Sequence, residues 1–165
     1  RQRGGEGLCV ADFVLPKSMG MDYVAMFVVT CGQGVLEHAA RLREEGQYLQ
    51  SHALQAVAIE SAEAFAELLH ARIRSMWGIG DPPAMTLREK FQAHYRGLRV
   101  SFGYPACPNL DDQRVLFGLL KPETIGVKLT EGMMMEPEAS VSALVFHHPE
   151  AKYFSVGEGA NLPSP

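Results

Sequence analysis

Apolar residues follow two spacings along the chain, and these predict strands near both ends with helices between them. Two short runs rich in β-branched and aromatic residues lie at residues 7–16 (GLCVADFVLP) and 22–30 (DYVAMFVVT). A second pair lies at residues 140–148 (SVSALVFHH) and 152–156 (KYFSV). Because Gly, Pro and Ser bound such runs in strands, all four are interpreted as strands or strand-like segments.

The middle of the chain has the 3.6-residue spacing of amphipathic helices and is rich in Ala, Leu and Glu. The predicted helices cover residues 34–45, 50–78, 86–95 and 111–120. Gly78 and the following GDPP turn end the second helix, and Asp111 or Asp112 is available to cap the last one. Strands at both ends and helices between them predict an α+β fold.

The longest predicted helix has one apolar and one charged face when residues are placed about 100° apart. The apolar stripe, predicted to face the core, consists of Leu54, Ala58, Phe65, Leu69 and Met76. The opposite face consists of Glu60, Glu63, Glu67, His70 and Arg74. Charged side chains on such a face ordinarily lie in water and form weak pairs along the helix, so we expect these residues to be exposed.

The composition and net charge of the chain exclude several classes of function. With 165 residues, 47% of them hydrophobic, the chain suits a single domain over residues 1–165, with 157–165 as a flexible tail. The net charge of −4, from 15 basic and 19 acidic residues, argues against a nucleic-acid partner. No apolar run approaches the roughly 20 residues of a membrane helix, and no signal peptide is recognisable, so a cytoplasmic location and no membrane partner are expected.

Three cysteines at wide spacing predict free thiols rather than disulfides or a metal site. His147 and His148 end an apolar run, where neighbouring side chains point to opposite faces, and are interpreted as surface or hydrogen-bonded histidines. Asp12 interrupts the apolar run at residues 8–15 and needs a partner if buried, although strand alternation can also turn it outward. Because neither the cysteines nor the two histidines form a metal-binding pattern, no metal ligand is predicted.

Residues 99–108 (RVSFGYPACP) contain Gly, Tyr, Cys and two Pro residues, a composition that suits neither a helix nor a regular strand. Gly103 and Pro105 specify a shaped loop, which can hold Arg99 at a fixed angle to a small anionic group. A purely structural corner is the alternative interpretation. A third hypothesis makes Cys107 a nucleophile with a histidine base, although no sequence feature brings such a pair together.

Six segments in order carry a resemblance that decides among these alternatives. They are LCVADFVLPK, AEAFAELLHARIRSMWG, GLRVSFGYPACP, IGVKLTE, PEASVSALVF and KYFSV. Together they resemble the activation domain of cobalamin-dependent methionine synthase, over most of residues 7–157. The resemblance implies a twisted antiparallel sheet with a long helix and several shorter ones. It also implies that the chain is a methyltransferase component that binds S-adenosylmethionine and presents its methyl group for reductive methylation of cob(II)alamin.

The resemblance also implies a set of binding residues, with none assigned to catalysis. Arg99 matches the family arginine that grips the methionyl carboxylate, and Asp12 and Glu63 match carboxylates that line the site. Backbone groups at Val100 are expected to meet the adenosyl part. The remaining matches are Tyr153 and Phe154, an aromatic pair near the adenosyl part, and Tyr104, which is expected to reach the corrin side.

The implied partners are a cobalamin-binding domain or corrinoid protein, which carries the cobalamin, and a flavodoxin-like electron donor. The chain lacks much of the N-terminal helical portion of the long enzymes and the helix after YFSV, which indicates a compact version of the domain, free-standing or excised. The protein served is methionine synthase or a related corrinoid methyltransferase. The alternative function is a corrinoid-protein docking module without an S-adenosylmethionine function.

Overall fold

The computed structural model describes residues 1–2 and 6–156, and the predicted tail at 157–165 lies outside them. The chain divides into two compact units, which are described separately. Among the described residues, the first unit contains 1–2, 6–26, 69–109 and 143–156, and the second contains 27–68 and 110–142. The single domain expected from chain length stays a prediction.

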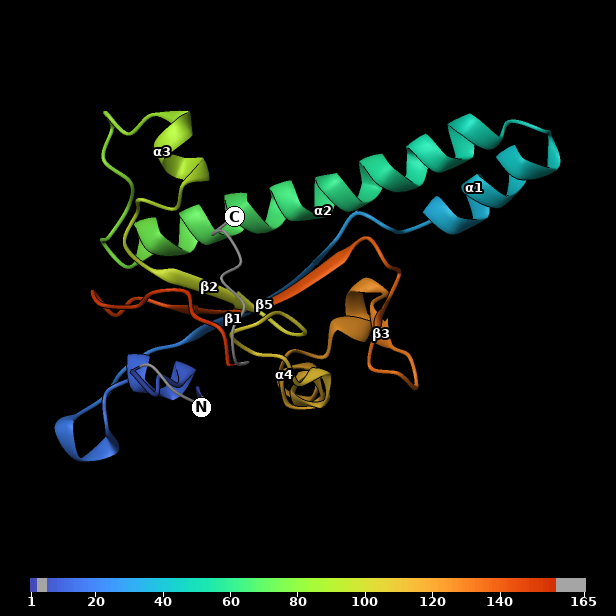
Figure 1. The fold of residues 1–165 in the computed structure, drawn as a ribbon. Helices are drawn as coiled ribbons and strands as arrows, with labels where there is room; N and C mark the ends of the chain where they lie inside the picture. Colours follow the sequence, from blue (N-terminus) through green and yellow to red (C-terminus); the bar gives the residue numbers. More distant parts are fainter. Residues whose placement is uncertain (3–5, 157–165) are drawn as a thin grey trace. The chain divides into compact units, whose positions relative to one another are not determined.

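The first unit contains the segments that carry most of the predicted site. Its elements are the 3-10 turns η1 (Val10–Phe13) and η2 (Lys17–Met19), the end of helix α2 (Tyr48–Met76), helix α3 (Leu87–Phe91), strand β2 (Leu98–Ser101) and the end of strand β5 (Ser140–Phe146). Strands β2 and β5 pair antiparallel, with Leu98 opposite Phe146 and Ser101 opposite Ala143 (Figure 1).

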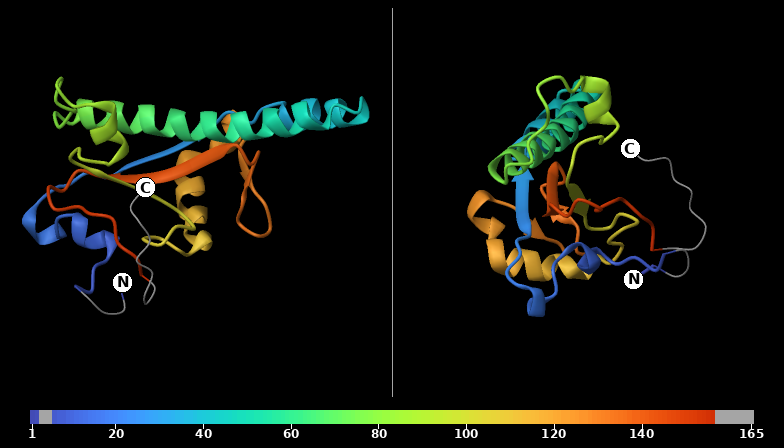
Figure 2. Two further views of the ribbon diagram at one scale, coloured as in Figure 1. Left: turned by 45° about the horizontal axis from the view of Figure 1, so that its top comes forward. Right: turned by 90° about the vertical axis from the view of Figure 1, so that its left-hand side faces the viewer.

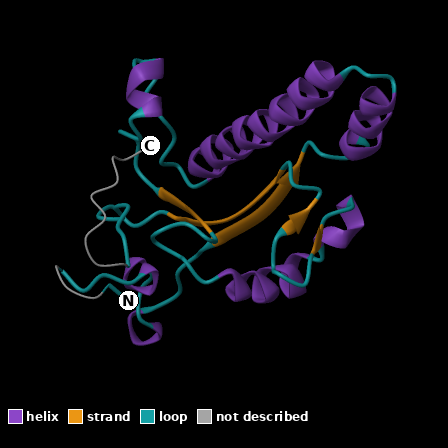
Figure 3. Ribbon diagram, turned by 45° about the vertical axis from the view of Figure 1, so that its right-hand side comes forward, coloured by secondary structure: helices purple, strands orange, loops and turns teal. Residues whose placement is uncertain are grey.

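The second unit contains most of the remaining elements. They are most of strand β1 (Ala25–Thr30), helix α1 (Val35–Glu44), the first part of α2, the turns η3 (Leu110–Asp112) and η4 (Pro122–Ile125), helix α4 (Gln113–Leu120) and strands β3 (Lys128–Leu129) and β4 (Met135–Glu136). Helix α1 lies alongside the start of α2 (Figure 2), where the Ser51 hydroxyl donates to the Ala39 carbonyl at 2.8 Å. The β3–β4 hairpin lies near α4 (Figure 3), where the Gln113 side chain donates to the Met133 carbonyl at 2.8 Å.

The α+β prediction is confirmed: helices accompany a sheet with strand order β1-β5-β2. Strands β1 and β5 lie within the predicted runs, and the run at 152–156 forms no strand. The strand prediction for residues 7–16 is wrong, because η1 occupies the middle of that run. The N–H of Cys9 donates to the Asp12 carboxylate at 2.8 Å, a local bond that competes with strand pairing.

Helix α3 is shorter than the predicted helix at 86–95. Its start is well defined, because the Thr86 hydroxyl accepts from the Glu89 N–H at 3.2 Å and the Glu89 carboxylate accepts from the Thr86 N–H at 2.7 Å. The helix ends at Phe91, and Ala93 then takes a left-handed conformation with φ of 52°. Asp112 occupies the N-cap position of α4, although its side chain makes no capping hydrogen bond.

The predicted faces of the long helix are only partly correct. Ala58 is buried as expected, but Phe65 and Met76 are exposed, Met76 by 84%. The buried positions include Ala58, Ala62, Ala66, His70 and Arg74, which recur every four residues. Small side chains allow close approach along this stripe, so the stripe, rather than the large apolar residues, marks the buried face. No helix in the described ranges combines the length and apolar character needed to cross a membrane.

Candidate functional site

Arg99 lies on β2, one of the two edge strands of the three-stranded sheet. Burial alternates along this strand: Leu98 and Val100 are buried, whereas Arg99 and Ser101 are half-buried. Because successive side chains point to opposite faces, Arg99 leaves β2 on the face opposite Val100. An edge strand also leaves part of its backbone polar groups directed away from the sheet, where a ligand can meet them.

The loop that follows β2 is closed on itself, as its glycine and prolines predict. The N–H of Gly103 donates to the Cys107 carbonyl and the N–H of Cys107 donates to the Tyr104 carbonyl, both at 2.9 Å. Gly103 has φ of 81°, which favours glycine at this position. Ala106 is buried inside the loop, and the Tyr104 side chain is exposed on its outside. The loop is therefore a fixed corner that presents an aromatic ring.

The C-terminal segment of the described chain packs on this loop. The N–H of Val156 donates to the Pro105 carbonyl at 2.9 Å. Partial burial raises the pKa of Tyr153, although the nearby Ala106 backbone N–H favours the ionised form. The nearby Tyr104 raises that pKa further. The Tyr153 phenol is therefore neutral at neutral pH, and Tyr104 is near enough to act on it.

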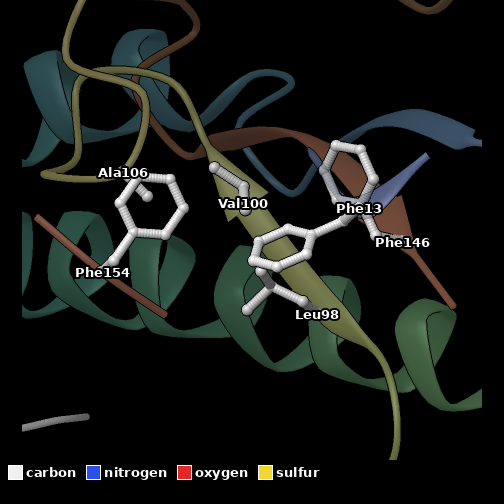
Figure 4. Close-up of a cluster of buried hydrophobic side chains, with 6 residues drawn as sticks. All are labelled: Phe13, Leu98, Val100, Ala106, Phe146 and Phe154. Carbon is white, nitrogen blue, oxygen red and sulfur yellow. The ribbon is translucent and has the colours of Figure 1, made fainter. Parts of the chain in front are cut away.

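Phe154 lies in a cluster of buried hydrophobic residues, shown in Figure 4. The cluster consists of Phe13, Leu98, Val100, Ala106, Phe146 and Phe154. The Phe154 and Phe13 rings meet edge to face with centroids 6.1 Å apart. Phe154 is 7% exposed and Tyr153 39%, so the two neighbouring aromatic residues occupy different environments. The Phe154 side chain serves packing, and a ligand contact by it stays a prediction.

Asp12 lies in η1 beside Phe13 and is exposed. Its carboxylate accepts the Cys9 N–H at 2.8 Å and pairs with the Arg1 guanidinium at 3.0 Å. The Cys9 N–H, with a smaller contribution from Arg1, lowers the pKa of Asp12 below its ordinary value. Of the two orientations open from the sequence, the outward one is found, and the carboxylate is an anion that already holds a cation.

Three of the predicted residues of the first unit adjoin one hydrophobic cluster, whereas the Arg99 side chain leaves β2 on the face opposite the cluster residues Leu98 and Val100. Asp12 precedes Phe13, Arg99 lies between Leu98 and Val100, and Tyr153 precedes Phe154. Tyr104 belongs to the loop that holds Ala106. Glu63 lies on the part of α2 in the second unit and is half-buried, and its place in the site stays a prediction.

Sequence reasoning missed a buried polar group in the first unit. His70 and Arg74 were expected in water, but they are 0% and 2% exposed. The Arg74 guanidinium lies 3.7 Å from the centre of the Tyr95 ring and pairs with Asp81 at 2.7 Å. The four-residue spacing of Ala58, Ala62 and Ala66, continued by His70 and Arg74, is the sequence signal that identifies them as buried.

His147 has the hydrogen-bonded environment expected of it. Its Nε2 lies 2.7 Å from the Asp22 carboxylate, and its ring meets that of Trp77 edge to face at 5.2 Å. Within the described ranges, His, Cys, Asp and Glu side chains form no group of three able to hold a metal ion.

Comparisons with known proteins agree on one family. A family model described as "Vitamin B12 dependent methionine synthase, activation domain" matches residues 1–161. Methionine synthases of Mycobacterium tuberculosis and Mycobacterium leprae are 37% and 36% identical to the chain, and each match covers 94% of the chain but 14% of the relative. A crystal structure of the MetH reactivation domain bound to AdoHcy superposes with a TM-score of 0.84 at 38% identity, over 94% of this chain and 49% of that one.

Proposed function

The chain belongs to the family of activation domains of vitamin B12 dependent methionine synthase, and from this premise we propose that it binds S-adenosylmethionine and presents its methyl group for reductive methylation of cob(II)alamin. The solved relative is a reactivation domain bound to AdoHcy, the demethylated form of the same nucleoside. The chain would then be the reactivation component of a methyltransferase, working in the cytoplasm on a cobalamin-binding domain with a flavodoxin-like electron donor.

The observation that carries this proposal is that Asp12, Tyr104 and Tyr153 adjoin one hydrophobic cluster, while Arg99 lies on the strand that contributes Leu98 and Val100 to it. These residues come from three segments distant in sequence. Their side chains are exposed or half-buried, whereas the neighbouring cluster residues are buried. An apolar base with a carboxylate and two phenols beside it, and a guanidinium on the other face of the strand that borders it, offers partners for a ligand with an ammonium group, an aromatic base and a carboxylate.

The chemistry of these side chains matches the two ends of the nucleoside. Arg99 offers a planar guanidinium, which binds carboxylates in paired hydrogen bonds. Asp12 is anionic and already receives the guanidinium of Arg1, so the ligand's ammonium group would exchange with a cation at that carboxylate. We propose Glu63 as a second carboxylate that offsets the positive charge of the ligand.

The adenosine end would meet the loop side of the cluster. The Tyr153 ring offers an apolar face beside the closed loop, and the β2 backbone at Val100 offers edge-strand polar groups. The buried side chains of Val100 and Phe154 would support these groups from behind. We assign Tyr104, which is exposed on the loop, to the side of the site that faces the partner's corrinoid.

No side chain in this arrangement needs to act as an acid or base. S-adenosylmethionine supplies an activated methyl group when bound, and the corrinoid belongs to the partner. The chain's own residues would hold and orient the nucleoside, and such positioning can account for a large part of a rate enhancement.

Thermal unfolding of the chain with and without S-adenosylmethionine tests the proposal. At a ligand concentration of 100 times the dissociation constant we expect a stabilisation of about 2.7 kcal/mol, or roughly 5–10 °C in Tm. Arg99→Ala should weaken binding about 10- to 100-fold, the effect of losing a hydrogen bond to a charged group. Arg72→Ala, an exposed arginine on the same unit, is the matched control. No shift with the wild-type chain at saturating ligand would overturn the proposal and favour the docking module.

A further inference from the structure

A buried polar cluster in the first unit has no part in the proposed site. His70 and Arg74 come from the end of α2, Asp81 from the turn after it, and Tyr95 from the segment before β2. Arg74 Nε and Nη2 donate to Asp81 Oδ1 at 3.1 and 2.7 Å. The Tyr95 ring lies under the Arg74 guanidinium and meets the His70 ring edge to face at 5.3 Å.

This cluster carries an energetic cost that packing alone does not require. Arg74 Nη1 and both ring nitrogens of His70 are buried and have no hydrogen-bond partner in the described part of the chain. A buried polar atom without a hydrogen-bond partner destabilises the folded state, because it loses its bonds to water and gains none. Burial, and then the charges of Arg74 and Arg99, lower the pKa of His70 to about 3, so its imidazole is neutral at physiological pH. Buried polar atoms without a hydrogen-bond partner concentrate at functional sites.

The cluster is coupled to β2 at the point where that strand begins. Gly97, the residue before β2, has φ of 103°, and a Cβ placed there would lie 3.3 Å from Arg74 Cδ. The Arg74 side chain thus packs directly on the backbone two residues before Arg99. Tyr95, held between Arg74 and His70, lies two residues before Gly97. The charge of Arg99 is also near enough to act on His70.

We propose that His70, Arg74 and Tyr95 are positioning residues for Arg99. These three residues fix the start of β2 and so set the affinity for the amino-acid end of the nucleoside, although they do not touch the nucleoside. The inference rests on the proposed function, in which Arg99 binds the carboxylate. The planar Arg74 guanidinium is essential to it, because Asp81 and the Tyr95 ring both contact that group. A lysine would keep the charge but lose the paired and stacked contacts.

Two ligands separate positioning from general stability. S-adenosylhomocysteine has the amino-acid end, whereas 5′-methylthioadenosine keeps the adenosine and sulfur without it. Affinities of both are measured for the full chain and for Arg74→Met, Arg74→Lys, Arg99→Met and the double variant Arg74→Met/Arg99→Met. The matched control is Arg72→Met. If Arg74→Met does not fold, His70→Leu replaces it, and His70→Phe, which restores a ring against Tyr95, is its rescue.

We expect Arg74→Met to weaken S-adenosylhomocysteine about tenfold and to leave 5′-methylthioadenosine within about twofold, with little further loss once Arg99 is Met. Arg74→Lys should not restore the affinity. Equal loss of both ligands, additive effects in the double variant, full recovery by Lys, or no effect of Arg74→Met would each overturn the positioning role. If the wild-type chain does not bind S-adenosylhomocysteine, or Arg99→Met does not weaken it, the proposed function fails and the positioning role with it.

Discussion

Replacing Phe154 and Tyr153 with alanine should separate the packing role of one aromatic residue from the ligand role of its neighbour. Phe154 is 7% exposed, and its ring contacts Phe13 edge to face within the hydrophobic cluster. Removing a buried Phe side chain costs about 3–5 kcal/mol, because the apolar surface and the filled volume are both lost. For a chain of this size we expect Tm to fall by roughly 6–20 °C.

Tyr153→Ala should behave differently, because Tyr153 is 39% exposed and part of its surface is already in water. Substitution of such a side chain costs about 1 kcal/mol. Urea unfolding of both variants gives the free energies, and titration with S-adenosylhomocysteine gives the affinities. Tyr153→Ala should weaken the ligand more than it destabilises the fold, and Phe154→Leu, which keeps most of the volume, should cost far less than Phe154→Ala. Equal destabilisation by Tyr153→Ala and Phe154→Ala would refute this assignment of roles.

Two further predictions concern stability. Gly32→Ala should destabilise the chain by about 1–3 kcal/mol in urea unfolding, because its Cβ would lie 2.5 Å from Pro137 Cβ, whereas Gly118→Ala, in a helix with open space, should stabilise by about 0.5–1 kcal/mol. The same sign for both variants would contradict the packing around Gly32. The N–H groups of Leu15 and Tyr23 lower the pKa of Asp22 below 3.8, so its stabilisation should be present above that pH and be lost as pH falls through the folded pKa. The difference in unfolding free energy between wild type and Asp22→Asn should therefore shrink below about pH 4, and a constant difference would contradict it.

Much of the secondary structure follows from the sequence because the composition of a segment often suits the element that forms there. The segment at 34–45 has the apolar spacing of a helix, the run at 140–148 is rich in β-branched and aromatic residues, and α1 and β5 form there. Residues 7–16 have the composition of a strand, but the hydrogen bond from the Cys9 N–H to Asp12 closes a turn instead. Strand β2 was not predicted, because it has only four residues and glycine and proline, which are typical of loops, follow it closely.

The candidate site shows a different limit of sequence reasoning. Composition and spacing single out Asp12, Arg99 and the loop after Arg99, whereas the ligand roles of these residues and the choice of Glu63 and Tyr153 depend on a family resemblance. No local pattern reveals that Asp12 and Tyr153, far apart in sequence, adjoin the same cluster. Buried polar side chains were missed for a related reason: a helical plot ranks residues by polarity, but His70 and Arg74 continue the buried four-residue stripe of the alanines before them.

The most direct test of the account is a crystal structure of the chain with S-adenosylhomocysteine. We predict that the ligand carboxylate lies within about 2.7–2.9 Å of the Arg99 guanidinium, with the adenosine against the loop that carries Tyr104 and Tyr153. The same map would show whether Asp12 exchanges Arg1 for the ligand ammonium group. A ligand bound elsewhere, or with its carboxylate on another cation, would contradict the central claim.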